Sequence, residues 1–368
     1  MSSKYQDELG LIVMNNCEEF GKKINENLMK RRSKNESFII PINEVRFNNG
    51  EGKGKIVDSV RDKDLYIISD VGNHSETYEM YGYKNHKSPD DHYQDIKRII
   101  SATRGQTDRL TVVMPLLYQS RQHRRKGRES LDCALAMREL QNLGVNTIVT
   151  FDVHDPNIQN AAPTGMGFEN FYPTNTILEE FIKSENFDPN NVKFISPDSG
   201  AVDRARYYAN MFGSDVGMFH KRRDCSRIVD GKNPVIAHDY LGGSLDGKTA
   251  IVVDDMIASG GSMLEVAGTL KERGAEKVFL IATFSLFTNG IKAFNEAYEK
   301  GLFDKMYSTN LTYVDPEAYK TPWYKQINCA DFASDVINTL NTSGSISELK
   351  NGKQKILSML VKKKNGEL

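Results

Sequence analysis

The sequence has few cysteines and no long apolar run, and these absences narrow the classes of protein to which it can belong. The four cysteines are widely spaced and form no Cys-x-x-Cys pair, so neither a structural zinc site nor a disulfide framework is predicted, and reduced thiols are expected. They are Cys17, Cys133, Cys225 and Cys329. No apolar stretch of about 18 residues and no signal-peptide core occur, so no membrane span is expected and a cytoplasmic protein is predicted.

An excess of charge of one sign is also lacking. Lys and Arg total 48 and Asp and Glu total 49, which gives a formal net charge of −1 over 368 residues. A near-neutral chain has no global field that draws it to nucleic acid or to a membrane surface, so neither partner is expected. The hydrophobic content of 39% suits a globular protein, and the length suits two domains of ordinary size.

The stretch from Thr249 to Met263 carries the strongest chemical signal. Thr249–Val253 is typical of a buried parallel strand, and Asp254 and Asp255 follow where that strand is expected to end. A helical pattern around residues 264–270 comes after a short loop of small residues. The loop consists of Ala258, Ser259, Gly260, Gly261 and Ser262. A strand, a Gly/Ser loop and a helix N-terminus form an anion cradle, because free N–H groups and the helix dipole point at the ligand.

The two acids beside this cradle indicate a ligand with both hydroxyl groups and a phosphate, which describes a sugar phosphate. The segment contains neither the Gly-x-Gly-x-x-Gly dinucleotide fingerprint nor a Gly-Lys-Ser/Thr phosphate loop. The alternative is an ordinary strand-to-helix turn with capping residues. Two adjacent acids at the end of a buried strand are unfavourable unless they are used, which favours the ligand site.

Short apolar segments alternate with helical patterns through most of the chain, which predicts an α/β fold of mainly parallel sheets flanked by helices. The expected strands are Asp64–Ser69, Leu110–Pro115, Thr147–Val153, Val192–Pro197, Thr249–Val253 and Val278–Phe284, and expected helices include Leu131–Leu143 and Val202–Met211. Polar loops follow strands in both halves, so two domains are predicted, residues 1–172 and 173–350, with a boundary near Pro173. The polar segment Gly72–Asp91 is interpreted as a surface insertion. Residues 351–368 are expected to form a basic tail, frayed or with a short helix at Gln354–Val361.

Two further loops place acids after expected strands. Asp152 and His154 follow the strand at residues 147–153, where a carboxylate and an imidazole can share a divalent cation or a metal-bound triphosphate. Asp198 follows the strand at residues 192–197 and suits a pyrophosphate with its metal. On local sequence alone, a hydrogen-bonded histidine in a capped loop and an Asp that caps the next helix are the favoured alternatives.

Two segments are strongly basic. Phe219–Asp224 contains Lys221 and Arg223 and is interpreted either as an exposed loop that closes over charge developing in phosphoryl transfer, or as a solvated charge run. Tyr118–Arg128 is compatible with a nucleic-acid patch, a nucleotide contact or a solvated loop. The near-neutral net charge and the lack of interleaved aromatic residues weigh against nucleic acid.

A third segment, Phe47–Glu51, is an Asn/Gly turn that needs no function to explain it. An aromatic ring beside Asn and Glu can equally hold a purine and its amino group, so both interpretations stay open.

Taken in their order, these segments resemble the motif series of the ribose-phosphate pyrophosphokinase (phosphoribosyl pyrophosphate synthetase) family. The series is Phe-x-x-Gly-Glu, Arg-Gln, Asp-x-His-x-x-x-Ile-Gln, Ser-Pro-Asp-x-Gly, Lys-Arg-Arg and Val-Asp-Asp-Met-Ile-x-Ser-Gly-Gly-Ser, and it extends roughly from Leu11 to Lys350. The resemblance implies tandem phosphoribosyltransferase-like domains, with the last part of the second packing back on the first. It also implies Mg²⁺-dependent transfer of pyrophosphate from ATP to the anomeric hydroxyl of ribose 5-phosphate, by a homo-oligomer that is a dimer or a hexamer.

The resemblance assigns roles motif by motif. Asp254 and Asp255 bind the ribose hydroxyls, and Ala258, Ser259, Gly260, Gly261 and Ser262 bind the 5-phosphate. ATP is placed, partly across a subunit boundary, by Phe47, Asn49, Glu51, Arg121 and Gln122. Metal and triphosphate contacts are His154, Asp198 and, as an outer carboxylate, Asp152. The catalytic cations are Lys221 and Arg223.

The sequence departs from the family pattern at several positions. His123 stands where the family usually has an acid, Ala201 replaces a frequent Gly, and Ala258 replaces a frequent acid. With the Gly72–Asp91 insertion, these changes bear on regulation, oligomer geometry and adenine preference. Two other functions remain as alternatives: a non-catalytic regulatory homologue that binds synthetase subunits, and a phosphoribosyltransferase that acts on a base. The retained Lys221 and Arg223 weigh against the first, and the matched N-terminal half weighs against the second.

Overall fold

The computed structural model describes residues 8–125, 127–223, 235–350 and 352–368. The chain divides into two compact units. The first comprises Met1–Pro173, Asn310–Tyr313 and Asn328–Asn351, and the second comprises Thr174–Thr309, Val314–Ile327 and Gly352–Leu368. In the described residues no helix is both long enough and apolar enough to cross a membrane.

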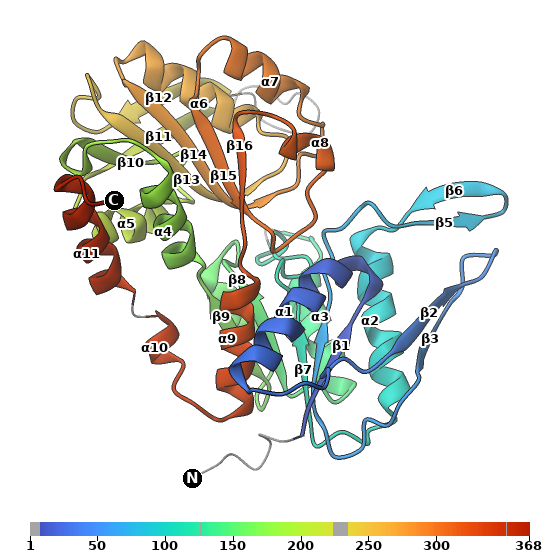
Figure 1. Ribbon diagram of the computed structural model, residues 1–368. Helices are drawn as coiled ribbons and strands as arrows, with labels where there is room; N and C mark the ends of the chain where they lie inside the picture. Colours follow the sequence, from blue (N-terminus) through green and yellow to red (C-terminus); the bar gives the residue numbers. More distant parts are fainter. Residues whose placement is uncertain (1–7, 126, 224–234, 351) are drawn as a thin grey trace. The chain divides into compact units, whose positions relative to one another are not determined.

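The first unit is built on a five-stranded sheet with the order β1-β4-β7-β8-β9, in which every pairing is parallel (Figure 1). Its central strands are continuous apolar runs because helices cover both faces of a parallel sheet. The strands are β1 (Leu9–Val13), β4 (Asp64–Ile68), β7 (Arg109–Val113), β8 (Thr147–Phe151) and β9 (Gly167–Phe171). The helices are α1 (Glu18–Arg31), α2 (Pro89–Thr103), α3 (Asp132–Asn142), α9 (Ala330–Asn341) and α10 (Ser347–Lys350), with 3-10 turns at Asn15–Cys17 and Pro156–Ala161.

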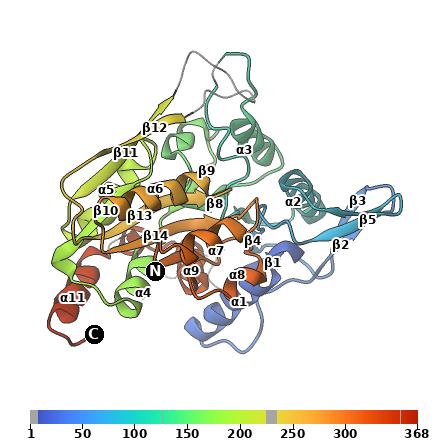
Figure 2. The same ribbon diagram turned by 90° about the horizontal axis from the view of Figure 1, so that it is seen from above.

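Two antiparallel hairpins lie side by side beside α2 in this unit (Figures 1 and 2). One pairs β2 (Ile42–Arg46) with β3 (Gly52–Ile56), and the other pairs β5 (Thr77–Met80) with β6 (Tyr83–His86). The backbone N–H of Tyr81 donates to the carbonyl of Asn48 across them, at 2.9 Å. The β5–β6 hairpin is largely exposed, so the expected surface position of residues 72–91 holds there. It is wrong at the ends, where residues 73 and 87 are buried and α2 begins at residue 89.

Two late segments of the chain, Asn310–Tyr313 and Asn328–Asn351, are joined to the first unit by buried polar contacts. The Asp64 carboxylate is fully buried and accepts from Arg109 Nε at 2.7 Å and from Asn341 Nδ2 at 2.7 Å. Asp70, just after β4, accepts from Thr312 Oγ1 at 2.9 Å and from the N–H of Tyr313 at 2.6 Å. These hydrogen bonds satisfy carboxylates that burial would otherwise penalise, so they fix the late segments on this sheet.

The second unit is built on a seven-stranded sheet with the order β12-β11-β10-β13-β14-β15-β16, in which only the β11–β12 pairing is antiparallel. Its strands are β10 (Val192–Ser196), β11 (Val216–Arg223), β12 (Val235–Leu241), β13 (Thr249–Ile257), β14 (Lys277–Ser285), β15 (Lys305–Thr309) and β16 (Tyr324–Ile327). Its helices are α4 (Thr174–Ser184), α5 (Val202–Phe212), α6 (Gly261–Glu272), α7 (Lys292–Glu299), α8 (Pro316–Tyr319) and α11 (Lys353–Lys364), with a 3-10 turn at Pro189–Asn191. The expected tail helix is confirmed as α11, which packs against α4 and α5 (Figure 1).

Two expectations about the second unit are wrong. The strand at residue 249 does not end at residue 253, because β13 stays paired with β14 as far as Ile257, so both acids lie within it. Residues 219–223 are not a loop, because they form the end of β11 and pair with β12. In both cases the neighbouring strand decides the outcome.

Candidate active site

Strand register brings two acidic segments of the second unit to one edge of its sheet. β10 and β13 are adjacent and parallel, with Ile195 opposite Val252 as their last registered pair. β10 ends one residue later, whereas β13 continues to Ile257. The loop that carries Asp198 therefore lies level with the part of β13 that carries Asp254 and Asp255. The carboxyl edge of a parallel sheet is where such folds bind ligands.

Asp254 and Asp255 differ in exposure. The Asp254 side chain is 25% exposed and that of Asp255 is 4% exposed. The backbone N–H of Asp255 donates to Asp254 Oδ1 at 2.9 Å. Burial, together with the charge of Asp255, raises the pKa of Asp254 well above its usual range.

Arg204, in the first turn of α5, faces both acids. Its Nη1 lies 3.7 Å from Asp255 Oδ1 and 3.9 Å from Asp254 Oδ1, and its side chain is 10% exposed. The positive charge of Arg204 lowers the pKa of Asp254 and so opposes burial and the neighbouring acid. Sequence reasoning missed this residue, because nothing local to residue 204 indicates which strand will stand beside β10.

The predicted phosphate loop follows directly after β13 and leads into α6. Gly260 precedes α6 with φ of 83°, in the left-handed region, and a Cβ built on it would lie 2.3 Å from the Phe294 ring. Glycine is therefore required at this position for two separate reasons. Gly261 is exposed, and no atom lies within 4 Å of a Cβ built on it. The helix has no side-chain cap at this end, so its first N–H groups face an open cradle of small residues, which suits an anion.

Asp198 Oδ1 accepts from the N–H groups of Gly200 at 2.8 Å and Ala201 at 3.3 Å, both of which precede α5. The helix itself has no side-chain cap, so the alternative interpretation of Asp198 as a helix cap is wrong. These hydrogen bonds do not exclude a second role, because the charge of Asp198 also raises the pKa of Asp254. Carboxylates supply the hard oxygen ligands that a divalent cation prefers, and a cation would offset the repulsion that Asp255 and Asp198 exert on ionised Asp254. In the described part of the chain no group of three or more His, Cys, Asp or Glu is arranged as a metal site. The residues fit Mg²⁺ in its other usual mode, in which one or two carboxylates hold it together with substrate phosphates.

Lys221 and Arg223 lie on the last residues of β11, where their backbones pair with residues 238 and 235 of β12. Their side chains lie outside the part of the chain that the structure describes. The catalytic role expected of them remains a prediction.

In the first unit, Asp152 and His154 follow β8. Asp152 is 2% exposed and has φ of 40°, and its N–H donates to the Phe171 carbonyl at 2.8 Å. His154 is half-buried, with its ring centre 5.6 Å from that of His123. His123, which departs from the family pattern, lies with Nε2 3.0 Å from Asp155 Oδ2. An acid from the neighbouring loop thus approaches the position where the family usually carries one.

The turn at residues 47–51 joins β2 to β3 and is held by its own polar groups. Asn49 Nδ2 donates to Glu51 Oε2 at 2.9 Å, and Phe47, the first residue of the turn, is 48% exposed. Arg46, at the base of the turn, donates to Asp95 Oδ2 at 2.9 Å, and Asp95 is 6% exposed. An exposed ring on a turn anchored by a buried ion pair is a suitable surface for a planar ligand.

Arg121 and Gln122 are exposed in the segment after β7, and the N–H of Gln122 donates to the Gln119 carbonyl at 2.8 Å. They belong to the first unit, as do Asp152, His154 and the turn at residues 47–51, whereas Asp198, Asp254 and Asp255 belong to the second. The ligand assignments of all these residues stay predictions.

Comparison with known proteins gives consistent results for both units. Residues 9–144 match the model of the N-terminal domain of ribose phosphate pyrophosphokinase, and residues 174–318 match the phosphoribosyl transferase domain. The chain is 28% identical to the ribose-phosphate pyrophosphokinase of Mycoplasmopsis pulmonis over 313 residues, covering 84% of this chain and 88% of the relative. It is 28% identical to that of Vibrio cholerae over 310 residues, covering 83% and 90%.

The fold is similar to the crystal structure of phosphoribosylpyrophosphate synthetase from Mycobacterium smegmatis. The TM-score is 0.74 at 20% sequence identity, and the match covers 92% of this chain and 100% of the other. The two domain models follow one another in this chain, and its relatives match over most of their length. The chain therefore belongs to the ribose-phosphate pyrophosphokinase family of enzymes.

Proposed function

We propose that the protein transfers pyrophosphate from ATP to the anomeric hydroxyl of ribose 5-phosphate, giving phosphoribosyl pyrophosphate and AMP. The observation that carries this proposal is the acid pair of β13 followed by the uncapped N-terminus of α6. The carboxylates at one end of this segment can accept hydrogen bonds from hydroxyl groups. The free N–H groups at the other end can donate hydrogen bonds to an anion. A pentose with a terminal phosphate is complementary to both ends.

At the sugar end, the carboxylates of Asp254 and Asp255 accept from the ribose hydroxyls and fix the ring. The N–H groups and hydroxyls of residues 258–262 hold the 5-phosphate. The positive charge of Arg204 favours the ionised form of Asp254, in which the carboxylate accepts hydrogen bonds, and so opposes the effect of burial. Holding the sugar at both ends fixes the direction in which its anomeric hydroxyl points, and such orientation is a large part of catalysis in phosphoryl transfer.

At the nucleotide end, we assign Phe47, Asn49, Glu51, Arg121 and Gln122 to ATP, and Asp152, His154 and Asp198 to its metal-bound phosphates. Mg²⁺, when bound, neutralises triphosphate charge and polarises the phosphorus that is attacked. Lys221 and Arg223 supply cations for charge that develops on the transferred group. No covalent nucleophile of the protein is needed for this transfer.

We also propose that the protein is a homo-oligomer, a dimer or a hexamer, and that it works in the cytoplasm on ATP and ribose 5-phosphate. Light scattering of the purified full-length chain measures the oligomer, and fractionation of the source cells measures its location.

The reaction is tested by mixing the full-length protein with Mg²⁺, ATP and ribose 5-phosphate over a range of phosphate concentrations. Formation of AMP in step with a pyrophosphorylated sugar supports the proposal. No AMP at any phosphate concentration would contradict it and would favour a regulatory homologue. Release of free pyrophosphate from phosphoribosyl pyrophosphate and a base would instead identify a base phosphoribosyltransferase.

A further inference from the structure

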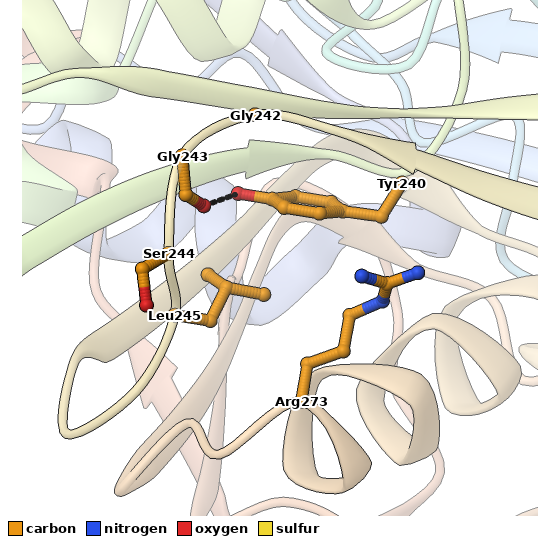
Figure 3. A pocket seen from close by; sticks show the side chains of 6 residues that line it. All are labelled: Tyr240, Gly242, Gly243, Ser244, Leu245 and Arg273. Carbon is orange, nitrogen blue, oxygen red and sulfur yellow. Dashed lines mark hydrogen bonds between the residues drawn. The ribbon is translucent and has the colours of Figure 1, made fainter.

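A pocket of about 380 Å³, whose lining Figure 3 shows, lies in the second unit. It is at the amino edge of the sheet, whereas the acid pair lies at the carboxyl edge. It is formed where β12 ends and β13 begins, beside the C-terminal end of α6. Because α6 runs back along β13 from the carboxyl edge, its last residues reach the amino edge. The lining residues are Tyr240, Gly242, Gly243, Ser244, Leu245 and Arg273. The proposed reaction uses none of them.

Two cationic side chains converge on the loop that walls this pocket. Arg273 ends α6, and its guanidinium carbon lies 5.3 Å from the centre of the Tyr240 ring (Figure 3). Lys193, the second residue of β10, is 7% exposed, and its Nζ lies 3.2 Å from the position of a Cβ built on Gly243. The two charges thus approach the Gly-Gly-Ser loop from the strand below it and from the helix beside it.

Lys193 is the more informative of the two cations. Among the residues that the structure describes, its ammonium group has no hydrogen-bond or ion-pair partner. Its Nζ is not one of the fully buried atoms without a partner in the described residues, so the stem is buried while the charge stays accessible beside the loop. An anion bound against the loop would supply the missing charge.

The loop Gly242–Ser244 leaves its backbone accessible to a ligand. Tyr240 Oη donates to the Gly243 carbonyl at 3.2 Å. A Cβ on Gly242 would lie 2.4 Å from Tyr240 Oη, so the ring can take this position only because residue 242 is glycine. Ser244 Oγ accepts from the N–H of Asp246 at 3.2 Å, which leaves its own O–H able to donate. The nearest acid of the loop, Asp246, packs instead against Gly274, where a Cβ would lie 2.9 Å from its Oδ1.

We propose that this pocket binds a small phosphate-bearing anion. Arg273 in the lining and Lys193 beside Gly243 supply the charge, and the Ser244 hydroxyl supplies a neutral donor. The volume exceeds that of a bare oxyanion and leaves room for an attached group. The site is separate from the proposed catalytic segment, so it stands whether or not the proposed reaction is correct.

The experiment measures binding of inorganic phosphate to the full-length protein by calorimetry, with ribose 5-phosphate and a non-hydrolysable ATP analogue present at saturation to fill the proposed catalytic site. Glycerol 3-phosphate is titrated in parallel, and tighter binding of this ester than of phosphate identifies an ester site. Lys193→Met keeps the apolar stem and removes the charge, and Arg273→Gln removes the second cation. Lys292→Gln, on α7 with a side chain 89% exposed, is the matched control.

Roughly tenfold or greater loss of phosphate affinity is expected in each pocket variant, with wild-type affinity in the control. A second readout is the melting temperature, which phosphate should raise for the wild type and not for Lys193→Met. Crystals soaked in tungstate should place an anomalous peak between residues 193, 243 and 273. Wild-type binding by both pocket variants, or a peak only at the N-terminus of α6, would overturn the proposal.

Discussion

Arg204 Nη1 stands 3.7 Å from Asp255 Oδ1, so a helix that begins beside one strand supplies the counter-charge for acids on the next. The distance is longer than a direct hydrogen bond, yet the guanidinium opposes a strong tendency of the acid pair to take up a proton. The residue acts on the acids through charge.

Replacing Arg204 with Gln is expected to raise the KM for ribose 5-phosphate roughly tenfold or more, because the acid pair then ionises less readily and accepts hydroxyl hydrogen bonds less well. The acid limb of the kcat/KM profile should also move to higher pH, which a merely structural role would not produce. Arg206→Gln, on the same helix but 62% exposed, is the control and should match the wild type. An unshifted pH profile in Arg204→Gln would contradict the assignment.

Asp254→Asn should weaken ribose 5-phosphate binding by about 1.5–3 kcal/mol, because a charged hydrogen-bond acceptor is lost. The raised pKa of Asp254 means that, in the wild type, sugar binding weakens as the pH falls through that raised value and the carboxylate gains a proton. The variant should lose this part of the pH dependence while keeping its KM for ATP. Asp203→Asn, with a side chain 91% exposed, serves as the comparison. Equal sugar affinity in Asp254→Asn and wild type would remove the residue from the site.

Substitutions at the two glycines of the phosphate loop are expected to have different effects, one on stability and the other on ligand binding. Gly260→Ala should destabilise the protein by at least about 1–2 kcal/mol, because of its left-handed φ and the contact with Phe294. Gly261→Ala meets no neighbouring atom, so its melting temperature should stay near the wild-type value while the KM for ribose 5-phosphate rises. Thermal unfolding and initial rates measure the pair. A fully active Gly261→Ala would show that the phosphate does not approach this backbone.

Asp70 is expected to make the first unit less stable as the pH rises from about 4 to about 6. Burial raises the pKa of Asp70 from 3.8 to about 6, although it accepts hydrogen bonds from residues 312 and 313. The folded chain therefore binds this proton more tightly than the unfolded chain does, and stability is lost as the proton leaves. The contribution is about 3 kcal/mol. In Asp70→Asn, urea midpoints measured across this range should fall less steeply than in the wild type. Parallel slopes would refute the prediction.

Local pattern is enough to predict the elements whose own residues carry the signal. Apolar runs at β4, β7 and β8 and the periodicity of α3 and α5 gave bounds within two residues of those observed. Local sequence does not predict the secondary structure of a segment that becomes a strand only by pairing with a neighbouring strand. Residues 219–223 carry successive cations, and they are a strand because β12 pairs with them.

The acid pair shows the same limit inside the candidate site. Its two residues and the small-residue loop are visible in sequence, because the chemistry sits in one continuous segment. That the acids lie within β13, rather than after it, depends on pairing with β14. Likewise, the approach of Arg204 and Asp198 depends on β10 lying beside β13. The order of strands in the sheet cannot be predicted from the sequence of these segments alone.

The late segments of the chain have a consequence for how the gene can be divided. Phe332 of α9 packs against Phe151 and Phe171 at ring-centre distances of 5.8 Å and 6.4 Å, and Arg31 of α1 pairs with Asp335 at 2.7 Å. A crossover at residue 173 between this gene and that of a relative would thus join α1 and β8 from one parent to an α9 evolved for the other. Chimaeras should tolerate such exchange only when codons 310–313 and 328–351 travel with the first 173, so the inherited module is a discontinuous one.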